Sequence, residues 1–156
     1  MTAQIISITY KPVNQKQANP PDHFLRVPVE RANLIENHGI EGDRKAGHPE
    51  RQINIMSLAT LEKLAEEGYK VAPGEMGEQI IVSGLDISAL PSGSQLQLGE
   101  SAVLELVKPR NGCDRFITIQ GKTLPGTGEL GMIARVVAGG EIFVGAPVML
   151  KETKRV

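Results

Sequence analysis

The chain has no tryptophan and only three phenylalanines and two tyrosines, so its core must be built mainly from aliphatic side chains. Hydrophobic residues make up 40% of the 156 positions, which suffices for the core of one domain, residues 1–156. No apolar run approaches the roughly 20 residues that a transmembrane helix needs. Residues 1–9 also lack the basic start and the apolar stretch of a signal peptide.

Neither sign of charge is in excess, since 17 Lys and Arg face 18 Asp and Glu and the formal net charge is −1. Proteins that bind nucleic acid generally show a basic surplus, so we expect no nucleic-acid partner and, without apolar runs, no membrane. The single cysteine, Cys113, excludes an internal disulfide. A soluble protein in a reducing, cytoplasmic location follows as the expectation.

Glycine (17) and proline (10) are spread along the chain and separate short segments that carry apolar residues. These segments predict strands at residues 5–9, 52–56, 79–83, 95–98, 102–107, 133–137, 142–144 and 148–150, with one or two more within 25–35. The polar residues 11–22 and the glycine- and charge-rich residues 38–50 predict loops. Short strands at close spacing predict a mainly β fold, a closed β-barrel-like sheet.

One clear helix is predicted after residue 56. Ser57 is suited to the N-cap because its hydroxyl can satisfy a free backbone N–H. Leucines follow at helical spacing, at Leu58, Leu61 and Leu64, and Gly68 suits the end of the helix. Residues 86–90 predict a short helical turn in addition.

The only cysteine lies in the sequence KPRNGCDR, residues 108–115, which we call the cysteine segment. Lys108, Arg110 and Arg115 all lie within five positions of Cys113. Positive charge nearby favours the thiolate, which is both the nucleophilic form and the soft-metal ligand. A small buried apolar residue is the alternative for a lone cysteine, and the local sequence leaves both open.

Residues 39–51, GIEGDRKAGHPER, form a second candidate, which we call the cation loop. Arg44, Lys45 and Arg51, with His48 as a further candidate cation, share a loop whose glycines expose backbone N–H groups. That combination suits phosphate or another oxyanion. The alternative is a solvated surface loop whose charges pair with neighbours. No phosphate-binding GxxxxGK[ST] motif occurs, which disfavours nucleotide hydrolysis.

Residues 73–79, PGEMGEQ, form a third candidate, which we call the glycine turn. Glu75 and Glu78 lie three positions apart and would suit a metal ion or a cation. We favour the structural interpretation, in which these carboxylates bind backbone amides of the turn. The three histidines show neither the HExxH pattern nor zinc-ligand spacing.

The three segments, in this order, resemble the blocks of the MOSC family, the C-terminal domain type of molybdenum-cofactor sulfurases. The cation loop with the following glutamine resembles GxxGDRHAG…RQ, the glycine turn resembles PGxxGEN, and the cysteine segment resembles PRxPC. Residues 131–145 resemble the closing glycine-rich hairpin of the family. The resemblance spans roughly positions 5 to 150 and implies a β-barrel-like fold.

The resemblance also implies binding of molybdenum cofactor (molybdopterin) or of a sulfur species derived from it. In the best-understood relatives the family cysteine ligates molybdenum and the domain takes part in reducing N-hydroxylated compounds. Here that role falls to Cys113, as metal ligand and catalytic residue. The residues expected to bind the cofactor are Arg44, Lys45, Arg51, Glu78, Gln79, Arg110 and Arg115. A reductase would need an electron-donor protein, because the sequence shows no flavin, haem or iron–sulfur signature.

The chain departs from the family pattern at four positions. Gln79 stands where Asn is usual, Lys45 where His is common, Gly112 where Pro is common, and Ala146 where the closing motif often has Asp. These departures leave an alternative open, in which the chain is a non-catalytic interaction module that keeps the barrel without the cofactor.

Overall fold

The computed structural model describes residues 3–13, 26–44, 46–111, 117, 120–121 and 129–152, and the protein is mainly β, as predicted. The strands are β1 (Gln4–Tyr10), β2 (Val27–Pro28), β3 (Arg31–Ile35), β4 (Gly39–Ile40), β5 (Ile53–Ser57), β6 (Ile80–Ser83), β7 (Gln95–Leu98), β8 (Ala102–Asn111), β9 (Glu129–Ala138), β10 (Gly140–Phe143) and β11 (Val148–Glu152). The helices with described bounds are α1 (Leu58–Glu66) and the short 3₁₀ helix η1 (Ile87–Ala89), and the separately described Ile117 and Gln120 are also helical.

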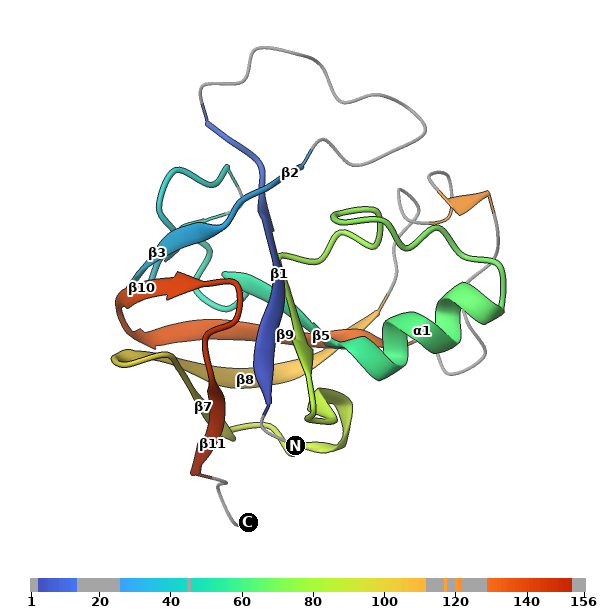
Figure 1. The fold of residues 1–156 in the computed structure, drawn as a ribbon. Coiled ribbons are helices and arrows are strands. Elements are labelled where there is room, and N and C mark those ends of the chain that lie inside the picture. Colours follow the sequence, from blue (N-terminus) through green and yellow to red (C-terminus); the bar gives the residue numbers. More distant parts are fainter. Residues whose placement is uncertain are drawn as a thin grey trace.

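The strands form a large curled sheet (Figure 1). Eight strands follow the order β11-β7-β8-β9-β5-β6-β1-β2, and β10, β3 and β4 form a smaller sheet. β1 also approaches the segment before β11, because the Ile5 N–H donates to the Ala146 carbonyl at 2.9 Å and the Val148 N–H donates to the Ala3 carbonyl at 3.0 Å. These bonds bring β1 against the opposite end of the sheet, which gives the protein its barrel-like form.

The interior of the curled sheet is aliphatic, as the lack of aromatic residues predicts. Its fully buried members include Ile5, Ile53, Ile55, Leu96 and Leu104. Burial of each such side chain contributes roughly 1.5–3 kcal/mol. A second, smaller cluster joins Leu64 of α1 to Met56 of β5 and Ile81 of β6, so it packs the helix onto the outer face of the sheet.

The helix begins and ends close to its predicted limits, but Ser57 does not cap it as expected. Ser57 has the N-cap position, yet its hydroxyl donates to the Leu85 carbonyl at 2.8 Å and accepts from the Ile87 N–H at 2.7 Å. The buried serine therefore ties β5 to η1. Gly68, at a φ of +91°, ends α1 as predicted, because it turns the chain into the left-handed region. No helix in the described part of the chain is long and apolar enough to cross a membrane.

Residues 131–145 do not form the hairpin that the family resemblance suggests. β9 pairs with β5 and β8, whereas β10 pairs with β3, so the chain passes from the large sheet to the small one at Gly139. A β-carbon at Gly139 would lie 2.7 Å from the Leu34 carbonyl oxygen, so this crossing needs a residue without a side chain.

Two strands run further than predicted. β8 continues through Pro109, and β9 begins at Glu129. Pro109 lies opposite Met132 of β9, with register shifts on both sides. Proline lacks the N–H that a regular ladder requires, and bulges accommodate it. The predicted loop over 38–50 is mainly turns, with the short strand β4 at its start. Of the predicted loop over 11–22, only residues 11–13 lie within the described part.

Candidate functional site

The cation loop is fixed to the barrel by the carboxylate of Asp43, which is buried. Its Oδ1 accepts a hydrogen bond from the backbone N–H of Lys11 at 3.1 Å, and its Oδ2 accepts one from the Gln79 side-chain amide at 2.7 Å. The Gln79 Oε1 in turn accepts from the Asn54 N–H at 2.6 Å. This chain of bonds joins the end of β1, the cation loop, the glycine turn and β5.

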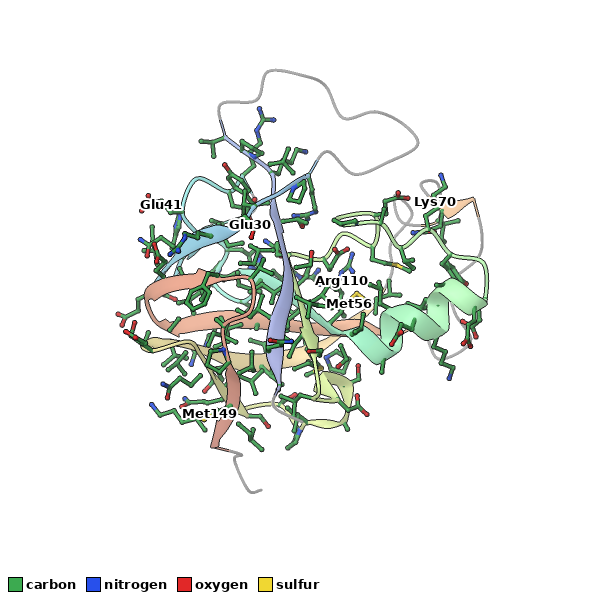
Figure 2. All side chains as sticks on the ribbon, in the orientation of Figure 1. Glu30, Glu41, Met56, Lys70, Arg110 and Met149 are labelled. Atoms are coloured by element: carbon green, nitrogen blue, oxygen red, sulfur yellow. The ribbon has the colours of Figure 1, made fainter. Side chains whose placement is uncertain are left out.

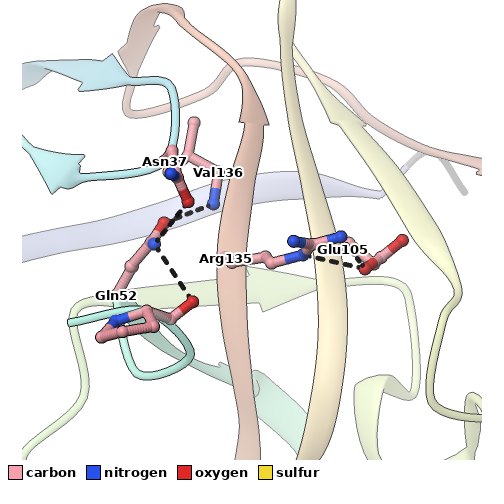
Figure 3. A network of polar contacts seen from close by, with 6 residues as sticks. Asn37, Gln52, Glu105, Arg135 and Val136 are labelled. Atoms are coloured by element: carbon pink, nitrogen blue, oxygen red, sulfur yellow. Dashed lines mark hydrogen bonds and ion pairs between the residues drawn. The ribbon is translucent and has the colours of Figure 1, made fainter. Parts of the chain in front are cut away.

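Gln52 holds the other end of the cation loop (Figure 3). Its side chain is fully buried, and its Nε2 donates to the His48 carbonyl at 3.0 Å while its Oε1 accepts from the Val136 N–H at 2.9 Å. His48 Nδ1 accepts from the backbone N–H groups of Glu50 and Arg51, both at 3.1 Å. His48 therefore stabilises the turn as a hydrogen-bond acceptor.

The glycine turn is organised around the buried carboxylate of Glu78. Its Oε2 accepts from the Gly74 N–H at 2.8 Å and its Oε1 from the Met76 N–H at 3.1 Å. Burial raises the pKa of Glu78, and these hydrogen bonds and the charge of Arg26 act in the opposite direction. The arrangement matches the structural interpretation, in which a carboxylate of the turn binds its own backbone amides.

Arg110 of β8, labelled in Figure 2, also contacts the glycine turn. Its guanidinium Nη1 donates to the Met76 carbonyl at 2.7 Å, and only 8% of the residue is exposed. The side-chain amide of Gln120 donates to the carbonyls of Glu75, at 3.2 Å, and Lys70, at 3.0 Å. Strand β8 therefore supports the glycine turn directly, just before the chain reaches Cys113.

The cysteine segment also meets the end of the cation loop. Lys108 Nζ of β8 lies 3.9 Å from Glu50 Oε2, and both side chains are about half exposed. Beside this pair is a cleft of about 240 Å³, lined by Pro49, Glu50, Gly93, Glu105, Leu106, Val107 and Arg135. The ion pair of Arg135 with Glu105, at 2.8 Å, forms part of its wall (Figure 3), so the cleft favours a polar occupant.

A family model described as the MOSC domain matches residues 42–149, which include most of the cation loop, the whole glycine turn and the cysteine segment. The chain belongs to the MOSC domain family. Domains of this family are associated with molybdenum cofactor. A comparison with curated proteins found none that matches the chain.

Solved structures similar to this MOSC domain agree with its fold. YiiM from Geobacillus stearothermophilus has a TM-score of 0.72 at 22% identity, over 96% of this chain and 75% of that one. YiiM from Escherichia coli has a TM-score of 0.69 at 22% identity, over 98% and 71%. The YUAD protein from Bacillus subtilis has a TM-score of 0.71 at 18% identity, over 95% and 94%. At these identities the likeness shows the fold alone.

The residues of this MOSC domain that were predicted to bind the cofactor differ in exposure. Arg44 and Arg51 are exposed on the cation loop, where their guanidinium groups suit the anionic part of such a cofactor. Glu78 and Gln79 are only 1% and 3% exposed, so their side chains support the segments from beneath and present little surface to a ligand. Lys45, Cys113 and Arg115 lie outside the described residues. No group of three or more His, Cys, Asp and Glu within the described part is placed to hold a metal ion.

Sequence reasoning missed the residues that hold the site together from outside its motifs. Asn54 and Gln120 bind the glycine turn, and Arg26 packs on it, since a β-carbon at Gly74 would lie 2.9 Å from the Arg26 β-carbon. Single polar residues in or beside predicted strands carry no pattern that distinguishes them. For Asn54 the one signal is that it is polar and lies between the apolar residues Ile53 and Ile55 of β5.

Proposed function

We propose that this MOSC domain binds molybdenum cofactor, or a sulfur species derived from it, through Cys113. The observation that carries the proposal is the contact of three separate segments. Bonds from Asp43 and Gln79 fix the cation loop to the glycine turn, and Arg110 fixes the glycine turn to β8, which leads into the cysteine segment. The arrangement supports one site that has cations on one segment and a thiol on another.

The division of labour follows from the chemistry of the side chains. Guanidinium groups of Arg44 and Arg51 would hold the terminal phosphate, since forked N–H donors match its oxygens. Cys113 would act as the thiolate, the form of cysteine that ligates a metal and that would add a sulfur donor to the sulfur ligands of the cofactor. When bound, the cofactor supplies a redox-active metal. Lys45 and Arg115 complete the proposed set of cations.

The sharper form of the proposal is an oxidoreductase that acts on N-hydroxylated compounds. Such a reaction consumes two electrons, and this chain carries no flavin, haem or iron–sulfur motif, so an electron-donor protein is part of the proposal. A cytoplasmic location belongs to it as well, because the single thiol stays reduced there.

Metal analysis of protein from a host that makes the cofactor tests the proposal. We expect molybdenum in the parent protein, and its loss in Cys113→Ser, since a serine hydroxyl stays protonated at neutral pH and oxygen is the harder ligand. Arg44→Ala with Arg51→Ala should weaken cofactor binding by about one to two decades per contact, because each charge-assisted hydrogen bond contributes about 1.5–3 kcal/mol.

The matched control is Arg31→Ala. Arg31 is an exposed arginine of β3 that pairs with Glu141 of β10 at 3.0 Å and lies outside the three segments. It should leave loading unchanged. A parent protein without molybdenum, or a Cys113→Ser protein that loads like the parent, would contradict the proposal.

The alternative is an interaction module without cofactor, and one observation favours it. Met149 and Leu150 are 56% and 46% exposed on β11, the strand at the end of the eight-stranded order. Exposed apolar residues on a terminal strand suit a protein partner. Absence of molybdenum, together with a native Cys113 that resists a thiol reagent, would select this function instead.

A further inference from the structure

Arg26 lies outside the motifs and outside residues 42–149, to which the family model corresponds. It directly precedes β2, whose residue Val27 pairs with Tyr10 of β1, so the antiparallel register brings Arg26 toward Lys11. The Arg26 Nε and Nη1 atoms are shielded from solvent. A guanidinium group is costly to bury unless negative charge lies close to it.

Two carboxylates supply that charge, one from each supported segment. Asp43 accepts from the Lys11 N–H at 3.1 Å, which places the cation loop at the end of the β1–β2 ribbon. Glu78 accepts from the Gly74 N–H at 2.8 Å, and a β-carbon at Gly74 would lie 2.9 Å from the Arg26 β-carbon. The Arg26 stem therefore packs on the backbone that Glu78 binds.

The electrostatics agree with this placement. Burial lowers the pKa of Arg26, and the charges of Asp43 and Glu78 raise it. Because the two carboxylates belong to different segments, a guanidinium group near both favours the arrangement in which the segments lie together. Lys11, which follows β1, contacts the Asp43 carboxylate through its backbone N–H.

We propose that Arg26 is a positioning residue of the candidate site, whose guanidinium group near the carboxylates of Asp43 and Glu78 couples the cation loop to the glycine turn. Its importance for a ligand rests on the proposed function, but the coupling itself is a property of the protein alone. Arg26, just before β2, thus positions two segments of the family motifs from outside those motifs.

Amide hydrogen exchange of the ligand-free protein tests the proposal, with the variants Arg26→Met, Arg26→Lys and, as a matched control, Arg31→Met. In Arg26→Met, exchange at the amides of Lys11, Gly74 and Met76 should be at least tenfold faster than in the parent. Arg26→Lys keeps the charge without the fork, so its rates should lie between the two. Amides of the β8–β9 ladder should keep the parent rates in every variant.

A second readout separates coupling from ordinary packing. The Glu78 carboxyl, followed by carbon-13 NMR, should titrate at higher pH in Arg26→Met than in the parent, because a nearby positive charge is lost, and should be unchanged in Arg31→Met. Any one of three results for Arg26→Met would overturn the proposal. The three amides could exchange at the parent rates, exchange could accelerate equally throughout the β8–β9 ladder, or the Glu78 titration could stay unshifted. If Arg26→Met does not fold, Arg26→Lys decides: faster exchange at the three amides supports the coupling and parent rates overturn it.

The two proposals fail independently. Exchange is measured without any ligand, so an Arg26 result stands whether or not the parent protein binds molybdenum. Conversely, the parent protein could load molybdenum while Arg26→Met exchanges at the parent rates. The proposed function would then stand, and only the coupling proposal would fail.

Discussion

Replacing Gln52 by alanine tests whether one buried amide holds the cation loop on the barrel. The change removes the acceptor of the Val136 N–H, at 2.9 Å, and the donor to the His48 carbonyl, at 3.0 Å. The buried Val136 N–H that loses its partner costs about 1–3 kcal/mol, and the part-buried bond to the His48 carbonyl contributes about 0.5–1.5 kcal/mol. We therefore expect the free energy of unfolding to fall by about 1.5–4.5 kcal/mol, against a total of about 5–15 kcal/mol for a domain.

Urea denaturation measures that loss, and Gln97→Ala provides the matched control. The Gln97 amide also donates to two carbonyls, those of Gly99 at 3.2 Å and Glu100 at 3.1 Å, but in a turn that water reaches. Water replaces these bonds, so the control should lose less than about 0.5 kcal/mol. If Gln52→Ala were no less stable than Gln97→Ala, the argument that the buried amide anchors the loop would be refuted.

Three further predictions follow from single residues. A β-carbon at Gly131 would overlap the Ile55 carbonyl oxygen, whereas a β-carbon at Gly145 would meet open space at nearly the same φ (+97° against +94°). The free energy of unfolding, measured by urea denaturation, should therefore be at least about 2 kcal/mol lower for Gly131→Ala than for Gly145→Ala. Burial raises the pKa of Glu78, so its contribution to stability is full below the unfolded-state pKa of about 4.3 and is lost as pH rises toward the folded-state pKa. Relative to Glu78→Gln, the parent should lose up to about 1.4 kcal/mol per pH unit in that window by urea denaturation, and a pH-independent difference would count against it. Cys113 should react with a thiol reagent in the native protein faster than a free model thiol at pH 7, and slower reaction would argue for a structural cysteine.

The strand pattern was predictable because glycine, proline and apolar segments alternate so regularly. What that pattern does not contain is the continuation of β8 through Pro109, since a proline normally ends a strand. The bulges that accept it depend on the partner strand β9 and not on local sequence. The crossing at Gly139 is unpredictable for the same reason, because the contact that demands glycine is the distant Leu34 carbonyl.

The three candidate segments were predictable from the sequence, but the roles of most side chains within them were not. Glu78 binds backbone amides of the turn, as the structural interpretation expects, whereas nothing in the sequence indicated that Gln79 joins Asp43 to the Asn54 N–H. Cofactor contact by either residue stays a prediction. The sequence likewise held no sign that Nδ1 of His48 would accept from the backbone N–H groups of Glu50 and Arg51. A motif names residue types, whereas the direction of a side chain follows from which backbone groups the fold leaves without a partner.

Two departures from the family pattern become intelligible in this structure. Gln79 uses both ends of its amide, accepting from the Asn54 N–H at 2.6 Å and donating to Asp43 at 2.7 Å, so the longer side chain here fills the space between β5 and the cation loop. Ala146 is fully buried, and its carbonyl accepts from the Ile5 N–H where β1 meets the start of β11. A carboxylate at that position would lose its hydration, which costs several kcal/mol unless a partner is supplied. Both residues therefore serve the barrel, and neither departure decides for or against a cofactor; that decision rests with the thiol of Cys113 and the exposed cations Arg44 and Arg51.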